Sequence, residues 1–296
     1  MIDPFHAGPH DLFARDKIEP NSDADAATSR HDWAFPIFTR TAEIQQFAQA
    51  HLKRILMSHS LNDVTLVLVH GAWHGAWVWD DLRAEMTDYT TEAVELPSSG
   101  YDPEQLGSFA DDVDIIRTTV QKIAKPVVVI AHSYGGLPTT QALCGLDNVI
   151  GVVYIAAWVL DVGQSAAIIA GEQGLPDWWE VHPEGGYMDA LRPTEVFYND
   201  LDPERARTFS VRLAHQSLDG AAHALEDAVW KYVPTSYILC ERDAGLAPSI
   251  QQLMSRHTSK TTSFDTGHNP FLSRPSAVAA QIREDVAEFL EGRCRI

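Results

Sequence analysis

Ser133 is the residue of this sequence best placed to act as a nucleophile. It lies in the pentapeptide AHSYG at 131–135, between an apolar run at 127–131 and a helical stretch at 136–145. This is the pattern G-x-S-x-G with Ala131 in its first small position, and such a sharp strand-to-helix turn lifts the serine hydroxyl above the sheet. The helix that follows points its N-terminal amides at developing negative charge. We therefore predict that Ser133 is a catalytic nucleophile.

A serine hydroxyl needs a base to take its proton, and His268 is the best candidate among the thirteen histidines. It lies in the loop DTGHNP at 265–270, directly after an expected strand. Gly267 and Pro270 favour a turn there. Such a turn can present the imidazole to the serine.

Asp243 is the predicted acid that orients this imidazole and stabilises its protonated form. It follows the strand predicted at 235–240, and one helix and one strand fit between it and His268. Three other carboxylates remain alternatives. Glu241 would point along the strand end, Asp265 is too close to His268 to reach around its ring, and Asp161 follows another strand.

An oxyanion formed at the serine needs amide donors. We expect one from the backbone of Tyr134 and a second from Ala72, in the loop HGAWHG at 70–75. His70 and His74 in this loop have a spacing that suggests a metal site. No third ligand is near and the segment should not be helical, so we interpret His70 as a hydrogen-bonding residue that shapes the loop.

The elements that must position these residues alternate between strands and helices. Strands are predicted at 64–69, 92–96, 127–131, 149–157, 235–240 and 261–264, and helices at 105–123, 136–145 and 275–290. Several of the strands are continuous apolar runs, as expected for strands buried on both faces. The alternation predicts an α/β fold with a mostly parallel sheet flanked by helices.

Two segments fall outside this alternation. Residues 1–56 are expected to be a partly helical extension, with a helix at about 41–57, followed by one domain over 57–296. Residues 162–232 are rich in aromatic side chains and do not continue the alternation of strands and helices. We predict that they form a small helical cap inserted over the sheet.

Composition narrows the class of partner. The 296 residues include 41 acidic and 22 basic ones, for a net charge of −19, which disfavours nucleic acid and anionic membranes. The three cysteines are far apart and show no metal pattern. No run reaches the roughly 18–20 apolar residues of a membrane span. We expect a cytoplasmic protein that binds no nucleic acid and no membrane, and the sequence is compatible with a homodimer.

Four segments together resemble a known family. They are LVHGAWHGAWVW, AHSYGG, YILCERDAG and GHNPFLSRP, and the resemblance covers about 64–292. They are similar to α/β-hydrolases of the plant methylesterase and hydroxynitrile-lyase type and their microbial relatives. The resemblance implies the α/β-hydrolase fold with a small helical cap, no metal and no organic cofactor. It assigns the triad to Ser133, Asp243 and His268, and the oxyanion donors to Ala72 and Tyr134.

The substrate pocket of this family lies between sheet and cap, where Trp73 and Trp158 are expected to bind substrate. Further aromatic candidates in the cap are Trp178, Trp179, Tyr187, Phe197 and Tyr198. A pocket lined by aromatic side chains favours an apolar or aromatic small-molecule ester or lactone as substrate. We expect an esterase or lactonase that works through an acyl-enzyme.

Two alternatives remain at this stage: a lyase that cleaves a C–C bond on the same scaffold, and a non-enzymatic ligand receptor. An intact triad disfavours the receptor. The hydroxynitrile lyases of the family carry Thr where this chain has Gly71 and Lys where it has Asn269. A neutral Asn269 cannot stabilise a departing cyanide as an ammonium does. A retro-aldol or related lyase needs no cyanide and stays open.

Overall fold

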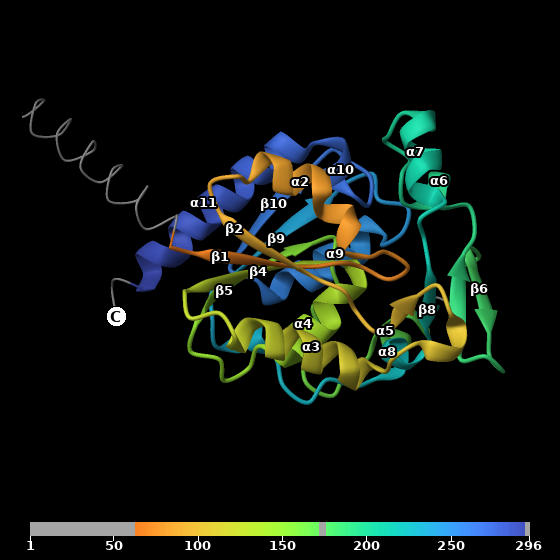
Figure 1. Cartoon of the computed structure of the whole chain (residues 1–296), viewed down its shortest axis with the longest axis horizontal. Helices are drawn as coiled ribbons and strands as arrows, with labels where there is room; N and C mark the ends of the chain where they lie inside the picture. Colours follow the sequence, from red (N-terminus) through yellow and green to blue (C-terminus); the bar gives the residue numbers. More distant parts are fainter. Residues whose placement is uncertain (1–62, 172–175, 294–296) are drawn as a thin grey trace, which may run out of the picture. The chain divides into compact units, whose positions relative to one another are not determined.

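The computed structural model describes residues 63–171 and 176–293 (Figure 1). The expected extension over 1–56 and its helix at about 41–57 lie outside the described residues. Both stay predictions.

Within the described residues, six parallel strands form one sheet in the order β10-β9-β5-β4-β1-β2. Their bounds are β1 (Thr65–Val69), β2 (Thr90–Val94), β4 (Val127–His132), β5 (Val149–Ile155), β9 (Thr235–Cys240) and β10 (Lys260–Phe264). The central strands β1, β4 and β5 are buried along their whole length, because helices cover both faces. In the register of β1 and β4, Val69 is opposite Ala131. The loop after β1 therefore begins beside the turn that holds Ser133.

Helices flank the sheet on both sides, as predicted. Helices α2 and α11 lie on one face and α3 and α4 on the other (Figure 1). The bounds of the core helices are α2 (Asp80–Glu85), α3 (Phe109–Gln121), α4 (Gly136–Ala142), α9 (Pro248–Met254), α10 (Pro270–Ser273) and α11 (Pro275–Arg293), with short 3-10 turns at η1 (Ala76–Trp79), η2 (Pro103–Gln105), η3 (Ser133–Gly135), η4 (Val229–Lys231) and η5 (Ser255–His257). Helix α3 begins at a capping box, in which Ser108 and Asp111 bond each other's backbone amides. No helix in the described ranges is long and apolar enough to cross a membrane.

The predicted strands and helices agree with the structure in type and order. The main shifts are at element ends: α3 begins at Phe109 rather than at 105, β2 begins two residues before the expected 92–96, and α4 ends at Ala142 rather than at 145. These are small displacements at element boundaries, where local signals are weakest. The predicted fold, a mostly parallel sheet flanked by helices, is confirmed.

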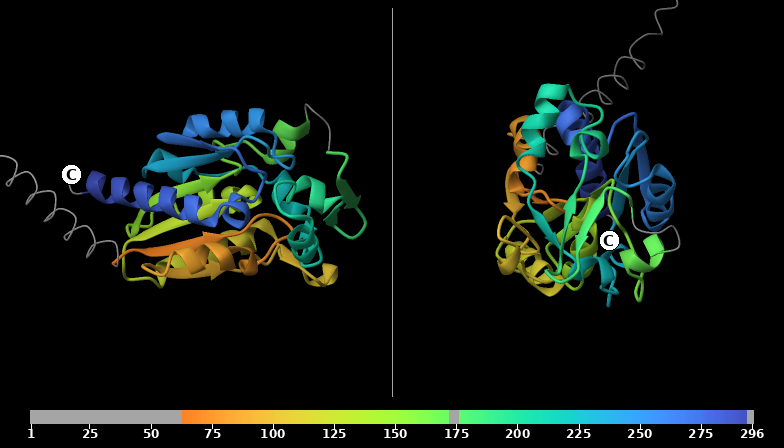
Figure 2. Two further views of the ribbon diagram at one scale, coloured as in Figure 1. Left: turned by 90° about the horizontal axis from the view of Figure 1, so that it is seen from above. Right: turned by 90° about the vertical axis from the view of Figure 1, so that its right-hand side faces the viewer.

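The segment expected to form a helical cap contains strands as well. Its helices are α5 (Ala166–Gly171), α6 (Pro193–Val196), α7 (Pro203–Ser210) and α8 (Asp219–Ala222). Among the described residues, β6 (Trp179–His182), β7 (Tyr187–Ala190) and β8 (His215–Ser217) pair antiparallel, and β3 (Ser99–Gly100) joins them from outside the cap in the order β3-β8-β7-β6. Figures 1 and 2 show this cap sheet at the carboxyl end of the parallel strands. The prediction of a helical cap was therefore incomplete, because apolar–polar alternation over four residues is too short to stand out against a helical pattern.

Candidate active site

The turn after β4 holds Ser133 in a strained conformation. Its φ is 52°, in the left-handed region that residues with a side chain rarely occupy. Gly135 and Gly136 follow, and a Cβ on either would collide with a backbone oxygen, that of His70 or that of Trp158. Only small residues therefore fit beside the serine, which explains the local pattern in the sequence.

The structure brings the three predicted triad residues together from three separate loops. The Nε2 atom of His268 lies 3.0 Å from the Oγ of Ser133, and its Nδ1 atom lies 2.7 Å from the Oδ2 of Asp243. His268 and Asp243 are 2% and 6% exposed. The geometry allows the imidazole to take the serine proton while the carboxylate holds the ring.

The carboxylate of Asp243 accepts hydrogen bonds at both oxygens. Besides His268, its Oδ2 accepts from the side-chain amide of Gln251 at 2.7 Å. Its Oδ1 accepts from the backbone amides of Gly245 and Leu246 at 2.7 and 2.9 Å. Gln251 is fully buried in α9 and was not identified from the sequence, since no local motif marks it. It acts on the imidazole through Asp243.

The alternative carboxylates have other partners. Asp265 forms an ion pair with Arg242 at 2.7 Å, and Asp161 forms one with Lys231 at 2.5 Å. Glu241 is exposed to solvent. Asp243 is the carboxylate that contacts His268.

The loop after β1 is held by the two histidines that suggested a metal site. The Nε2 of His70 accepts a hydrogen bond from the amide of Leu96 at 3.0 Å. His74 bonds Tyr198 through its Nε2 at 3.0 Å, and burial lowers the pKa of His74 to about 3. Both rings therefore have structural partners. Ala72, between them, lines the same cavity as Tyr134 and Ser133.

A buried polar network connects this loop with the residue after the nucleophile. The Oε1 of Gln216 accepts from the amide of Trp73 at 3.2 Å, and its Nε2 donates to the Oγ of Ser98 at 2.9 Å. The Oγ of Ser98 and the hydroxyl of Tyr134 both donate to the Oδ2 of Asp112, at 2.6 and 2.7 Å. Burial raises the pKa of Asp112 to about 6, although these bonds oppose the rise. Gln216 and Asp112 were not identified from the sequence because only the folded chain brings them together.

A cavity of about 290 Å³ opens onto the serine and is mostly apolar. Trp73 and Trp158, the expected substrate-binding residues, both line it. Of the five aromatic candidates in the cap, three also line it: Trp178, Trp179 and Phe197. The other two have different positions. Tyr198 is buried against His74, and Tyr187 stacks on His182 with ring centroids 4.4 Å apart.

A parallel sheet with a serine at a strand-to-helix turn, hydrogen-bonded to a histidine that in turn bonds an aspartate, is typical of α/β hydrolases. The chain belongs to the alpha/beta hydrolase family, whose model matches residues 66–281. It is 28% identical over 250 residues to an α/β hydrolase of Aspergillus novofumigatus (76% of this chain, 98% of the relative). It is 24% identical to methylesterase 7 of Arabidopsis thaliana (75% and 96%). The crystal structure of polyneuridine aldehyde esterase has a similar fold, with a TM-score of 0.65 and 22% identity over 75% of this chain and 98% of that one.

Proposed function

We propose that this protein is a serine esterase that acts through an acyl-enzyme. Ser133 attacks the carbonyl carbon of the substrate while His268 takes the hydroxyl proton, and Asp243 stabilises the resulting imidazolium. The amides of Ala72 and Tyr134 bind the oxyanion. His268 then gives the proton to the leaving alcohol, and water attacks the acyl-enzyme by the same route in reverse. The observation that carries the proposal is the chain of hydrogen bonds from Ser133 to Asp243, at the wall of an apolar cavity.

The cavity supports a neutral, apolar or aromatic small-molecule ester or lactone as substrate. Apart from the site residues Ser133, Tyr134 and His268, its walls are mostly tryptophan, phenylalanine and aliphatic side chains, and no lysine or arginine of the described residues lines it. An anionic substrate would therefore be desolvated there without a cationic partner. Relatives named methylesterases support an ester as the reacting group.

The test combines turnover with active-site labelling. Purified protein is offered a panel of p-nitrophenyl esters and small lactones, and is separately labelled with a fluorophosphonate. Ser133→Ala should lower turnover by at least about 10³-fold and abolish labelling. Ser263→Ala, at an exposed position of β10, is the matched control and should behave like the parent. More than a tenth of parent activity in a folded Ser133→Ala protein would remove the assignment.

Mandelonitrile offered to the same preparation separates the esterase from a hydroxynitrile lyase. Asn269 is buried, and its Nδ2 donates to the carbonyl of Phe197 at 3.0 Å, so this position offers no ammonium to a departing cyanide. A Cβ on Gly71 would lie 2.7 Å from that of Ser133. A larger residue, such as the Thr of the lyases, would therefore fit here only if the neighbouring chain moved. We expect ester turnover with no cyanide release. Rapid cyanide release with no ester turnover would overturn the proposal, and tight ligand binding with no turnover would identify a receptor.

A further inference from the structure

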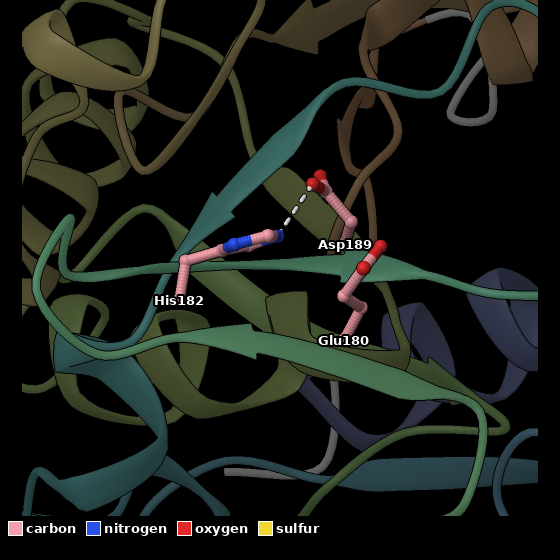
Figure 3. A group of neighbouring side chains, drawn as sticks. All are labelled: Glu180, His182 and Asp189. Carbon is pink, nitrogen blue, oxygen red and sulfur yellow. Dashed lines mark ion pairs between the residues drawn. The ribbon is translucent and has the colours of Figure 1, made fainter.

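The face of the cap sheet that turns away from the cavity carries a cluster of possible metal ligands. Trp179 and Val181 of β6 line the cavity. Side chains alternate along a strand, so Glu180 and His182 project from the opposite face. In the antiparallel pairing of β6 with β7, Glu180 is directly opposite Asp189. Figure 3 shows Glu180, His182 and Asp189 grouped on this face.

The spacing of the three side chains suits a small cation. One donor atom from each lies within 4.8 Å of the others. The Nε2 of His182 is 3.2 Å from the Oδ2 of Asp189. Two ligands of a tetrahedral zinc, each about 2.0–2.1 Å from the metal, are roughly 3.3–3.4 Å apart. The pair therefore already has the separation of two ligands, and the exposed side chain of Glu180 is free to approach.

One nitrogen atom of this cluster lacks a hydrogen-bond partner among the described residues. This atom, the Nε2 of His182, is shielded from solvent. Its contact with Asp189 is an ion pair only when the ring is protonated. Glu180 and Asp189 add a second unfavourable feature, since like charges directly opposite across two strands repel. A bound divalent cation would supply the missing partner of the ring nitrogen and neutralise both carboxylates.

Neighbouring side chains hold two of the ligands in place. The Nδ1 of His215 in β8 lies 2.7 Å from the Oδ1 of Asp189, which leaves Oδ2 directed toward His182. The ring of Tyr187 stacks on that of His182, with an interplanar angle of 22°. Supporting contacts of this kind orient the ligands of protein metal sites and raise their affinity.

We propose that Glu180, His182 and Asp189 bind a divalent transition-metal cation of the zinc type, which bridges β6 and β7. An imidazole with two carboxylates suits Zn²⁺, whereas Mg²⁺ and Ca²⁺ prefer oxygen ligands alone. The site lies outside the catalytic machinery proposed above, which needs no metal. Because the ligands alternate with Trp179 and Val181, the cation would also hold one wall of the cavity in place.

The test measures cation binding to the full chain in the absence of substrate, so its outcome is independent of the proposed esterase activity. Chelator-treated protein is titrated with Zn²⁺ by calorimetry, and with Co²⁺ to record the absorption of a tetrahedral site. The parent should bind one equivalent more than His182→Ala or Glu180→Gln. His215→Ala should keep the site but bind about 10- to 100-fold more weakly. Excess Mg²⁺ should not compete.

His223→Ala is the matched control. His223 stacks on Phe109 with ring centroids 4.3 Å apart and an interplanar angle of 21°, as His182 does on Tyr187, but it is outside the three-residue cluster. It should bind Zn²⁺ like the parent. Since Glu180 is exposed, Glu180→Gln tests the site without disturbing the fold, and circular dichroism checks each variant. Equal stoichiometry and affinity in the parent, His182→Ala and Glu180→Gln would overturn the proposal, and competition by Mg²⁺ would overturn the zinc-type assignment.

Discussion

The exchange of Asp243 for asparagine tests how the imidazole is oriented. Each carboxylate oxygen accepts two N–H groups: Oδ1 those of Gly245 and Leu246, and Oδ2 those of His268 and Gln251. Asparagine has one acceptor oxygen and one NH₂ group, which cannot accept. In either orientation, two buried donors lose their acceptor.

The size of the effect follows from these contacts. If the NH₂ group faces His268, the ring must accept at Nδ1 and carry its proton on Nε2, so it cannot take the proton of Ser133. The equivalent change in a Ser-His-Asp protease lowers kcat by about 10⁴, which corresponds to about 5.5 kcal/mol of transition-state free energy. If the NH₂ group faces the other way, the two backbone amides are unsatisfied. At about 1–3 kcal/mol for each buried donor, the unfolding free energy should fall by about 2–6 kcal/mol.

The assay is kcat/KM for the best ester of the panel, with circular dichroism and urea unfolding on the same samples. The control is Asp265→Asn. The Asp265 side chain is 71% exposed and pairs with Arg242 at the surface, so its loss should cost no more than about 1 kcal/mol of stability and leave turnover within about twofold. A folded Asp243→Asn protein with more than a tenth of parent kcat/KM and an unchanged unfolding free energy would refute the reasoning, because neither orientation of the amide allows both. If Asp265→Asn were the impaired variant, Asp265 would be the acid.

Three further outcomes are expected. Burial raises the pKa of Asp112 from its ordinary 3.8 to about 6. Between these two pH values the folded chain keeps a proton on Asp112 that the unfolded chain releases. The unfolding free energy should therefore fall by on the order of 3 kcal/mol as the pH rises from about 4 to about 6, and urea titrations should show that Asp112→Asn lacks this loss. Gly71→Ala would place a Cβ 2.7 Å from that of Ser133, so ester turnover should fall by at least about 10-fold. Gly292→Ala, with nothing within 4 Å of its added Cβ, should leave turnover unchanged. Removal of residues 1–56 should leave 57–296 folded, since the sheet begins at Thr65, and loss of its circular dichroism signal would contradict this.

The parts of the fold that could be predicted from the sequence are those encoded by neighbouring residues. Strand β4 begins at the predicted Val127 and ends within one residue of the predicted limit, because a strand buried on both faces is a continuous apolar run. The turn at Ser133 was recognisable because backbone oxygens close to Gly135 and Gly136 exclude larger side chains. The loops around Asp243 and His268 follow predicted strands, and parallel strands bring such loops to one edge of the sheet.

Contacts between distant residues were decided only by the tertiary structure. Gln251 bonds Asp243 from the next helix, and Gln216 reaches from the cap sheet to Trp73 and Ser98, with no local pattern to mark either glutamine. The cap sheet was also missed, since its strands are three or four residues long and are stabilised by pairing with β3 and with one another. A side chain's type and its immediate neighbours determine what it can do chemically. Which groups it contacts across the chain depends on packing, and packing exists only once the chain has folded.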